Sequence, residues 1–355
     1  MSLVVAVIVL GLLIFVHELG HFIVAKRTGV GVKVFSLGFG PALINIRRGQ
    51  TDYRLSIIPL GGYVRMVGEE PDEEVAPQEI PRSFTHKPVG VRMAIVAAGP
   101  AANVVFALIT YYLVLVLWGL PILAPSVGKV VKASPAQAAG LRPGDEIVAI
   151  DGKKITRWSD MVSIIQASKG RALVFRVRRG HRELSVVVRP RPEMVTDIFG
   201  ETQRIYRVGI IASGKRVIKR VGVFEAAQLA FTKAWVAAKL IGLTVVKLVQ
   251  AKVSVKELGG PIFIAQAAGQ MARYGLAPLM DFAALISVNL AVINLLPFPP
   301  LDGGHLLLFG IEAIRRRPLP LKARQWLQQV GLALVLLLMI VVFYNDIARI
   351  ITGGR

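Results

Sequence analysis

The chain has 355 residues, of which 54% are hydrophobic, and a mean hydropathy of +0.58. This composition is too apolar for an ordinary soluble protein and is typical of several membrane spans joined to a folded soluble part. The formal net charge of +21 would suit a nucleic-acid binder, but the basic residues are dispersed and border the apolar segments, so we expect contact with anionic membrane lipid and no nucleic acid. The absence of cysteine excludes disulfides and thiolate metal sites, so that any zinc ligands must be His, Asp or Glu.

Four segments contain the roughly 20 apolar residues needed to cross a bilayer: residues 4–25, 93–118, 279–296 and 326–347. The first has no basic region before it, which argues against a cleavable signal peptide. Residues 223–253 are also apolar, but they carry four lysines, which favours a helix lying in the membrane interface over the alternative of a fifth span. Four spans would place both termini on one side of the membrane.

The first apolar segment contains the motif His17-Glu18-Leu19-Gly20-His21. Residues four apart on a helix share a face, so both imidazoles can bind one Zn²⁺ while Glu18, one step round, can act as a base. The alternative is that the two histidines merely pack against a neighbouring helix. Ionisable residues inside membrane spans are costly to bury and usually functional, so the location of the motif favours a zinc site.

Residues 31–66 contain short β-rich runs separated by glycine and proline, which predict a small sheet with at least one hairpin, residues 43–47 against 53–58. The acidic residues 69–79 that follow are expected to form a solvated loop rather than a binding element.

A soluble domain of strands with one helix, residues 158–168, is predicted for residues 127–189. The motifs Ala139-Gly140-Leu141, Pro143-Gly144-Asp145 and Ile150-Asp151-Gly152 occur in order at the spacing of a bacterial PDZ domain. Its peptide groove is expected between residues 127–131 and that helix. Asp145 is expected to be structural in its turn. Residues 189–220 are either the remains of another module or a linker.

A catalytic zinc site usually has three protein ligands, so two histidines are incomplete. The best third candidate is Asp302, which ends the sequence Asn294-Leu295-Leu296-Pro297-Phe298-Pro299-Pro300-Leu301-Asp302 after the third span. Prolines interrupt helical hydrogen bonding, and irregular backbone is tolerated at membrane depth where protein or a water cavity covers it. His17 lies about 12 Å from the C-terminal end of its span, at 1.5 Å per residue, and the unwound chain after Leu296 can hold Asp302 at a comparable depth.

The basic residues of the short loops predict the orientation. Lys26 and Arg27 follow the first span directly, and residues 304–324 include Arg315, Arg316 and Arg317. By the positive-inside rule, residues 26–92 and 304–324 are cytoplasmic, whereas the soluble domain and both termini are extracytoplasmic.

With these motifs the chain resembles the site-2 proteases, intramembrane zinc metalloproteases, and specifically the bacterial branch that cleaves anti-sigma factors and remnant signal peptides. The resemblance covers nearly the whole length. Besides the two motifs already described, it rests on Gly259-Gly260-Pro261-Ile262, Gly99-Pro100-Ala101-Ala102-Asn103 and the PDZ-like insertion. Members with two tandem PDZ domains exist in this branch, whereas this chain has room for one.

The resemblance implies roles for individual residues. His17, His21 and Asp302 would be the zinc ligands and Glu18 the general base. Asn294, Pro297 and Pro299 would bind substrate, and residues 31–66 would present an edge to an unwound substrate strand. An ordinary interhelical hydrogen bond is the alternative for Asn294 and the favoured interpretation for Asn103. His305 is more plausible as a neighbour of the ligands than as a ligand.

The predicted protein is thus a polytopic α-helical membrane protein of four transmembrane helices, with a membrane-associated β element and an inserted α+β PDZ domain. Its parts are residues 1–120 with the metal helix and β element, 121–220 with the PDZ domain (core 127–189), 221–278 with the interfacial helix, and 279–355 with the last two spans. The expected function is zinc endopeptidase of the bacterial inner membrane, cutting transmembrane segments of single-pass proteins while the PDZ domain binds or screens substrate termini. The alternatives are a non-catalytic PDZ scaffold and a zinc transporter.

Overall fold

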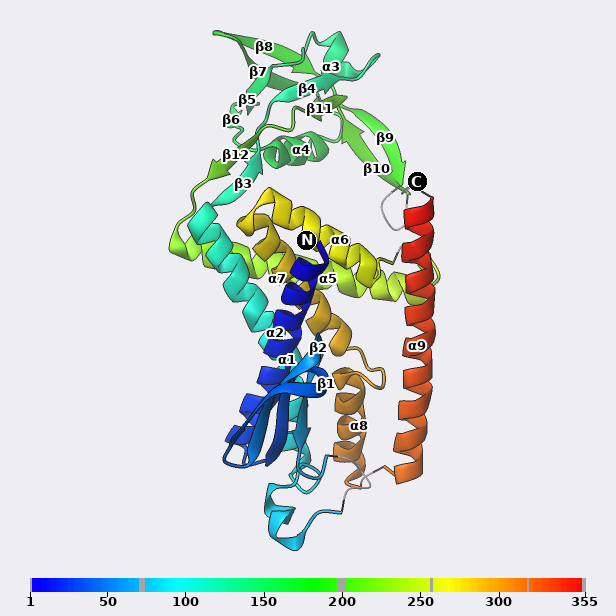
Figure 1. The fold of residues 1–355 in the computed structure, drawn as a ribbon. Helices are drawn as coiled ribbons and strands as arrows, with labels where there is room; N and C mark the ends of the chain where they lie inside the picture. The colour runs from blue at the N-terminus through cyan, green and yellow to red at the C-terminus, as the bar shows by residue number, and fades with distance from the viewer. Residues whose placement is uncertain (1, 70–73, 197–201, 256–257, 318, 353–355) are drawn as a thin grey trace. The chain divides into compact units, whose positions relative to one another are not determined.

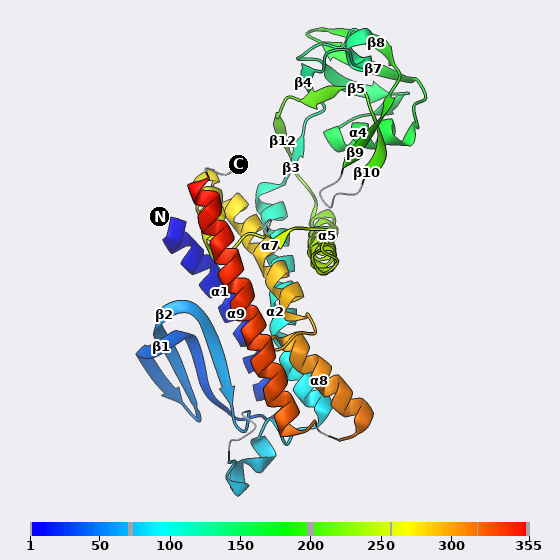
Figure 2. The same ribbon diagram turned by 90° about the vertical axis from the view of Figure 1, so that its right-hand side faces the viewer.

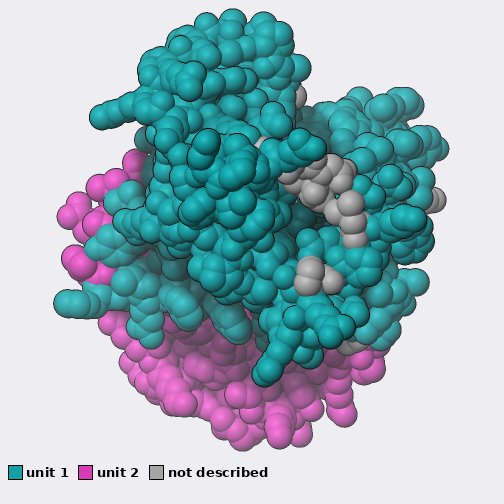
Figure 3. Space-filling model, turned by 90° about the horizontal axis from the view of Figure 1, so that it is seen from below, with its two compact units in different colours: residues 1–114, 224–355 teal, residues 115–223 magenta. Residues whose placement is uncertain are grey.

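The computed structural model describes residues 2–69, 74–196, 202–255, 258–317 and 319–352, and the chain divides into two compact units. Unit 1 comprises Met1–Val114 and Phe224–Arg355, and unit 2 comprises Leu115–Val223 (Figure 3). The helices of unit 1 are α1 (Ser2–Arg27), α2 (Val89–Trp118), α5 (Val223–Val249), α6 (Pro261–Tyr274), α7 (Leu276–Asn294), α8 (Asp302–Arg315) and α9 (Leu321–Ile351), with the short 3₁₀ helix η1 (Pro77–Arg82).

Five helices in the described part of the chain are long and apolar enough to cross a membrane: α1, α2, α5, α7 and α9. Length and composition alone therefore do not confirm the predicted count of four. Within unit 1, α5 differs from the others in direction: it lies across α1, α2 and α9 in Figure 1 and is seen end-on in Figure 2. The first residues of α1 and the last of α9 lie at the same end of the unit in both views.

A face of small residues attaches α5 to the bundle, namely Ala226, Ala230, Ala234 and Ala237. Lys233, on the same helix, forms an ion pair with Asp281 of α7 and lies 4.6 Å from the ring centroid of Tyr111 of α2. This lysine is therefore neutralised by protein rather than presented to hydrocarbon.

The β element is a sheet formed by β1 (Val32–Arg48) and β2 (Thr51–Met66). The predicted hairpin is confirmed, since Ile44 pairs with Leu55 and Ile46 with Tyr53. Both strands bend back, so that residues 34–37 pair with residues 52–55 on one side and residues 62–65 on the other. The sheet is held to α1 by a cluster of aromatic rings, Phe15, Phe22, Phe35 and Tyr53.

The helical path breaks after α7, as the prolines predict. Residues 295–301 are not helical, and Asp302 is the first residue of α8. α9 approaches this break so closely that a methyl group at Gly331 would collide with the carbonyl group of Pro299.

At its other end α9 caps α6: the Asp346 carboxylate accepts hydrogen bonds from the backbone amides of Gly260, Ile262 and Phe263. The Gly259-Gly260-Pro261-Ile262 motif therefore forms a helix start whose cap comes from elsewhere in the chain.

Unit 2 is built around the helix α4 (Trp158–Ala167) and a four-stranded sheet. The strands of this sheet are, in spatial order, β6 (Lys153–Lys154), β5 (Glu146–Ile150), β7 (Leu173–Arg179) and β8 (Arg182–Val188). Its interior contains Ile147, Met161, Leu173 and Phe175. Further strands are β3 (Leu120–Leu123), β4 (Val127–Val130), β9 (Arg191–Thr196), β10 (Thr202–Arg207), β11 (Ile210–Ala212) and β12 (Arg216–Lys219), with the one-turn helix α3 (Pro135–Ala138).

Residues 189–220 complete unit 2 instead of linking it onward. β9 and β10 form a hairpin, β11 pairs with β4, and β12 pairs with β3 where the chain enters and leaves. This corrects the expected position of the peptide groove. The edge of β4 that residues 127–131 were expected to offer to a peptide is already paired with β11. The cavity of about 830 Å³ next to α4 is lined by Ile210, Ile211 and Ala212 of β11 together with Trp158, Met161 and Ile165 of α4.

Candidate metal centre

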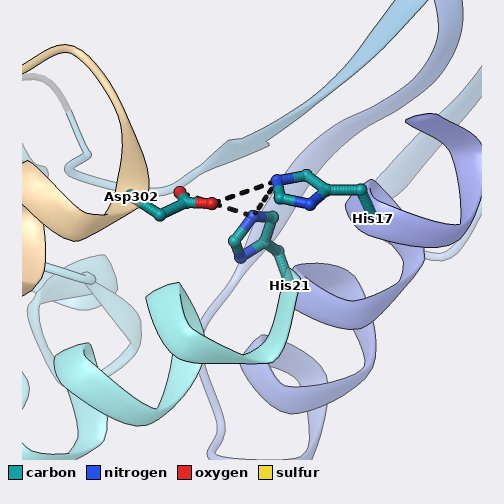
Figure 4. Close-up of side chains that lie close together, drawn as sticks. All are labelled: His17, His21 and Asp302. Atoms are coloured by element: carbon teal, nitrogen blue, oxygen red, sulfur yellow. Dashed lines mark hydrogen bonds and ion pairs between the residues drawn. The ribbon is translucent and has the colours of Figure 1, made fainter. Parts of the chain in front are cut away.

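His17 and His21 lie on the face of α1 that turns into unit 1. The buried residues of this helix repeat every three or four positions, from Val9 and Leu13 through both histidines to Ala25. The two histidine residues are each only 9% exposed, and their Nε2 atoms lie 3.1 Å apart. The helical spacing therefore directs both rings to one point, as the motif predicts (Figure 4).

Asp302 reaches the same point from α8 (Figure 4). Its Oδ2 lies 3.1 Å from His17 Nε2, and its Oδ1 lies 3.7 Å from His21 Nε2. A tetrahedral zinc ion with ligands at 2.0–2.1 Å separates those ligands by about 3.3 Å, so the three side chains fit the ion. Asp302 Oδ2 is buried and has no hydrogen-bond donor among the described residues, which is the environment expected of a group that faces a cation.

The neighbouring helix α2 makes room for the two rings. Its Gly99 lies opposite the imidazoles, where any side chain would collide with them. Gly20 of α1 has the complementary role, because a methyl group there would lie 2.8 Å from the Cβ of Ala102 and closer still to the carbonyl oxygen of Ala98.

The ring of His21 is oriented by α2. Its Nδ1 bonds to the Ile95 carbonyl oxygen at 2.8 Å, which leaves its Nε2 free for a metal.

Glu18 lines a cavity of about 270 Å³ together with both histidines and Asp302. The last segment of β2 forms part of the same wall, through Tyr63, Val64 and Met66. The backbone of Val64 lies beside the Glu18 carboxylate. A carboxylate, a candidate metal centre and the last segment of the sheet therefore line one cavity.

Charged residues also line this cavity, among them Glu69, Arg92, His305 and Arg324. Glu69 corrects the expectation that the acidic stretch is only solvated, although residues 70–73 of that stretch lie outside the described residues. His305 lies against Phe309, with 6.4 Å between ring centroids, and is not part of the ligand cluster.

Glu312 of α8, beside this cavity, is buried between two arginines. Its carboxylate lies 2.6 Å from Arg92 of α2 and 3.1 Å from Arg324 of α9. This charged triad ties the helix that carries Asp302 to two neighbouring helices.

The other predicted site residues, Asn294, Pro297 and Pro299, are not among the residues that line the cavity. Asn294 is the last residue of α7, and Pro297 and Pro299 belong to the break that follows it. Pro300 is the proline of this break that lines the cavity. Sequence reasoning missed Arg92 and Glu312, and it noted Gly99 only as part of a family motif without a role; these roles depend on contacts between helices far apart in the chain.

Comparison with known proteins identifies the family of the chain. The model of peptidase family M50 matches residues 5–338. The chain belongs to this family. It is 31% identical to the zinc metalloprotease RasP of Geobacillus kaustophilus, over 98% of both chains. It is also 31% identical to the regulator of sigma-E protease RseP of Salmonella typhimurium, over 98% of this chain and 99% of the relative. A putative zinc metalloprotease of Agrobacterium fabrum is 34% identical, over 97% of this chain and 95% of the relative.

This M50 protein is therefore a zinc metalloprotease of the site-2 type, and Zn²⁺ is its cofactor. With its apolar helices it is a polytopic protein of the bacterial inner membrane that carries a β element. Membership of a protease family sets aside the non-catalytic scaffold and the zinc transporter.

Proposed function

We propose that His17, His21 and Asp302 hold the zinc ion and that Glu18 is the general base of an intramembrane endopeptidase. The observation that carries the proposal is the convergence of three ligand atoms, all within 4.8 Å of one another, in the interior of an apolar unit. Among the residues that the structure describes, no other group of three or more His, Asp or Glu side chains has such spacing.

The bound zinc would supply Lewis acidity toward water and the scissile carbonyl group. Glu18 would accept a proton from the attacking water and transfer it to the leaving amine nitrogen, a role for which it must lie beside the ligands without being one. The buried position of its carboxylate, next to the Val64 backbone, is consistent with this role.

We propose that the substrate is a transmembrane segment of a single-pass membrane protein, such as an anti-sigma factor or a remnant signal peptide. Peptide bonds in a helix are shielded by their own hydrogen bonds, so an unwound segment needs replacement partners. Tyr63, Val64 and Met66 line the cavity, and residues 62–65 pair with one side of residues 34–37, which supports the pairing of this segment with an extended substrate. Asn294, Pro297 and Pro299 remain proposed substrate contacts from the loop beside the cavity.

Cleavage of a model transmembrane peptide by the purified full-length protein in detergent tests this function. Fragments are analysed by mass spectrometry, with and without a zinc chelator. Wild type should cut in a chelator-sensitive manner, and Glu18→Gln should be inactive while retaining zinc near wild-type stoichiometry. Substantial turnover by Glu18→Gln would remove Glu18 from the mechanism.

We propose that α1, α2, α7 and α9 cross the membrane and that α5 lies in its interface. The common end of α1 and α9 in Figures 1 and 2 supports an even number of crossings, and the transverse direction of α5 supports its exclusion from them. Phe231 and Trp235, both 63% exposed on α5, suit contact with lipid at that level. The zinc site would lie near the cytoplasmic side and unit 2 outside the cytoplasm.

We propose that unit 2 is a PDZ domain that binds or screens substrate termini, so that cleavage in the membrane waits for an earlier cut outside it. The cavity between β11 and α4 supports this role, because an extended chain end can add to a strand edge beside a helix. Replacing residues 124–215 with an Asn-Gly turn joins the paired strands β3 and β12 and removes the domain cleanly. The variant should still cut a pre-trimmed substrate and, under steric screening, also the untrimmed one. If the variant still binds zinc but no longer cuts the trimmed substrate, the screening role is rejected.

A further inference from the structure

Asn103 on α2 is fully buried, with 0% of its surface exposed, and it faces His17. Its Nδ2 lies 3.4 Å from the Nδ1 atom of that ring. Its Oδ1 has no hydrogen-bond partner among the described residues. A buried amide oxygen without a donor is unfavourable and rare, so this arrangement calls for an explanation.

The tautomer that the neutral ring of His17 needs as a metal ligand supplies that explanation. Nε2 of His17 points at Asp302 and His21, so a metal there requires its lone pair. In a neutral imidazole the proton must then reside on Nδ1, which becomes a donor that needs an acceptor. The two ends of an amide side chain are assigned from their hydrogen bonds, and a half-turn of the Asn103 amide exchanges Nδ2 for Oδ1. That turn pairs the orphaned oxygen with the Nδ1–H of His17.

We propose that Asn103 is a positioning residue whose Oδ1 accepts a hydrogen bond from Nδ1–H of His17, fixing the ring with Nε2 toward the metal. The inference rests on the proposed function only in taking His17 as a ligand. His21 has the matching arrangement, since its Nδ1 lies 2.8 Å from the Ile95 carbonyl oxygen. α2 would thus orient both imidazoles, one through its backbone and the other through Asn103.

The contact between α2 and α7 is separate from this role. Ser287 of α7 donates its hydroxyl hydrogen to the backbone carbonyl oxygen of Asn103, at 2.8 Å. This interhelical bond does not use the Asn103 side chain, so the expected packing function belongs to the backbone at this position. Ser287→Ala is therefore a matched control that removes the interhelical bond and leaves the amide in place.

The test measures zinc affinity of the full-length protein in detergent by competition with a chromophoric chelator. Asn103→Leu removes the acceptor at similar volume, and zinc affinity should fall by about 10–100-fold, the usual loss for partners of metal-bound histidines. Asn103→Asp keeps an acceptor oxygen toward Nδ1–H and should bind zinc with nearly wild-type affinity. Ser287→Ala should lower the thermal midpoint without changing zinc affinity.

Wild-type zinc affinity in Asn103→Leu would overturn the proposal, and so would an Asn103→Asp protein that binds zinc as weakly as Asn103→Leu. If Asn103→Leu does not fold, Asn103→Ala takes its place in the comparison with Asn103→Asp. A His17→Ala variant distinguishes the role of His17 as a zinc ligand from the positioning role of Asn103. Unchanged zinc binding in that variant would reject His17 as a ligand, whereas a loss there with no effect of Asn103→Leu would reject only the positioning role.

Discussion

Gly99 of α2 faces His17 of α1 at a point where a methyl group would lie 2.8 Å from the Cε1 atom of the ring. The same methyl group would lie closer still to His21, so Gly99→Ala cannot be accommodated without moving both imidazoles. We expect this variant to lose zinc and proteolytic activity together. Gly90→Ala is the control on the same helix, because nothing lies within 4 Å of the added atom. Equal zinc content in the two variants, measured by mass spectrometry of metals, would contradict this account.

Replacement of Asp302 by asparagine should weaken metal retention as well as activity. The change exchanges an anionic ligand for a neutral one at nearly constant shape. We expect faster zinc loss to a chelator than from Glu18→Gln, whose changed side chain is not a ligand. Asp160→Asn in unit 2 serves as the charge-matched control. Full zinc occupancy in Asp302→Asn under chelator challenge would place the third ligand elsewhere.

Glu312→Gln should destabilise unit 1, because it leaves Arg92 and Arg324 without their shared anion. These side chains are mostly buried, and Arg92 is only 6% exposed. Removing one member of a buried ion pair costs about 3–5 kcal/mol, which lowers a thermal midpoint by several degrees or more. Glu183→Gln breaks the exposed pair with Arg178 and should have little effect. Similar midpoints in detergent for the two variants would show that the buried triad adds nothing to stability.

Acid should destabilise unit 2 through Asp145. Burial raises the pKa of this carboxyl group, but hydrogen bonds from Arg179 and the Arg142 backbone amide, with the arginine charges, outweigh burial and hold the pKa below its usual value. A pKa lower in the folded than in the unfolded state gives stability that is present above pH about 4 and is lost as pH falls further.

Fluorescence of Trp158, with Trp118, Trp235 and Trp326 replaced, reports the unfolding of this unit in the full chain. The thermal midpoint should fall between pH 5 and pH 3, and it should fall less in Asp145→Asn, which has no proton to gain. Parallel midpoint curves for the two proteins would exclude Asp145 as a source of the acid sensitivity.

Single cysteines in this cysteine-free chain test the orientation. Ser159 on α4 and Gln50 in the β1–β2 turn are both exposed. An impermeant thiol reagent on intact cells should label a cysteine at Ser159 and not one at Gln50, because Gln50 lies in the segment that follows Lys26 and Arg27. Labelling after lysis confirms that both thiols are reactive. The reverse pattern would place the metal site and unit 2 on the opposite sides.

Local spacing in the sequence was sufficient for the parts of the site that depend on one helix or one turn. The four-residue spacing of His17 and His21 fixes them on one face, the prolines after Asn294 interrupt a helix, and the turn residues around Gly49 set a hairpin. Asp302 was also identifiable, because a carboxylate beside a helix break at membrane depth has few structural uses.

Other features were decided only by tertiary structure, because they depend on which surfaces meet. Asn103 is indistinguishable in sequence from any polar packing residue, yet its side chain faces His17 while its backbone makes the contact with Ser287. The strand beside the cavity of unit 2 is β11, which pairs with β4 across a long stretch of intervening chain. Hydrophobic periodicity records that a face is buried but not what covers it, and that is why these partners required the fold.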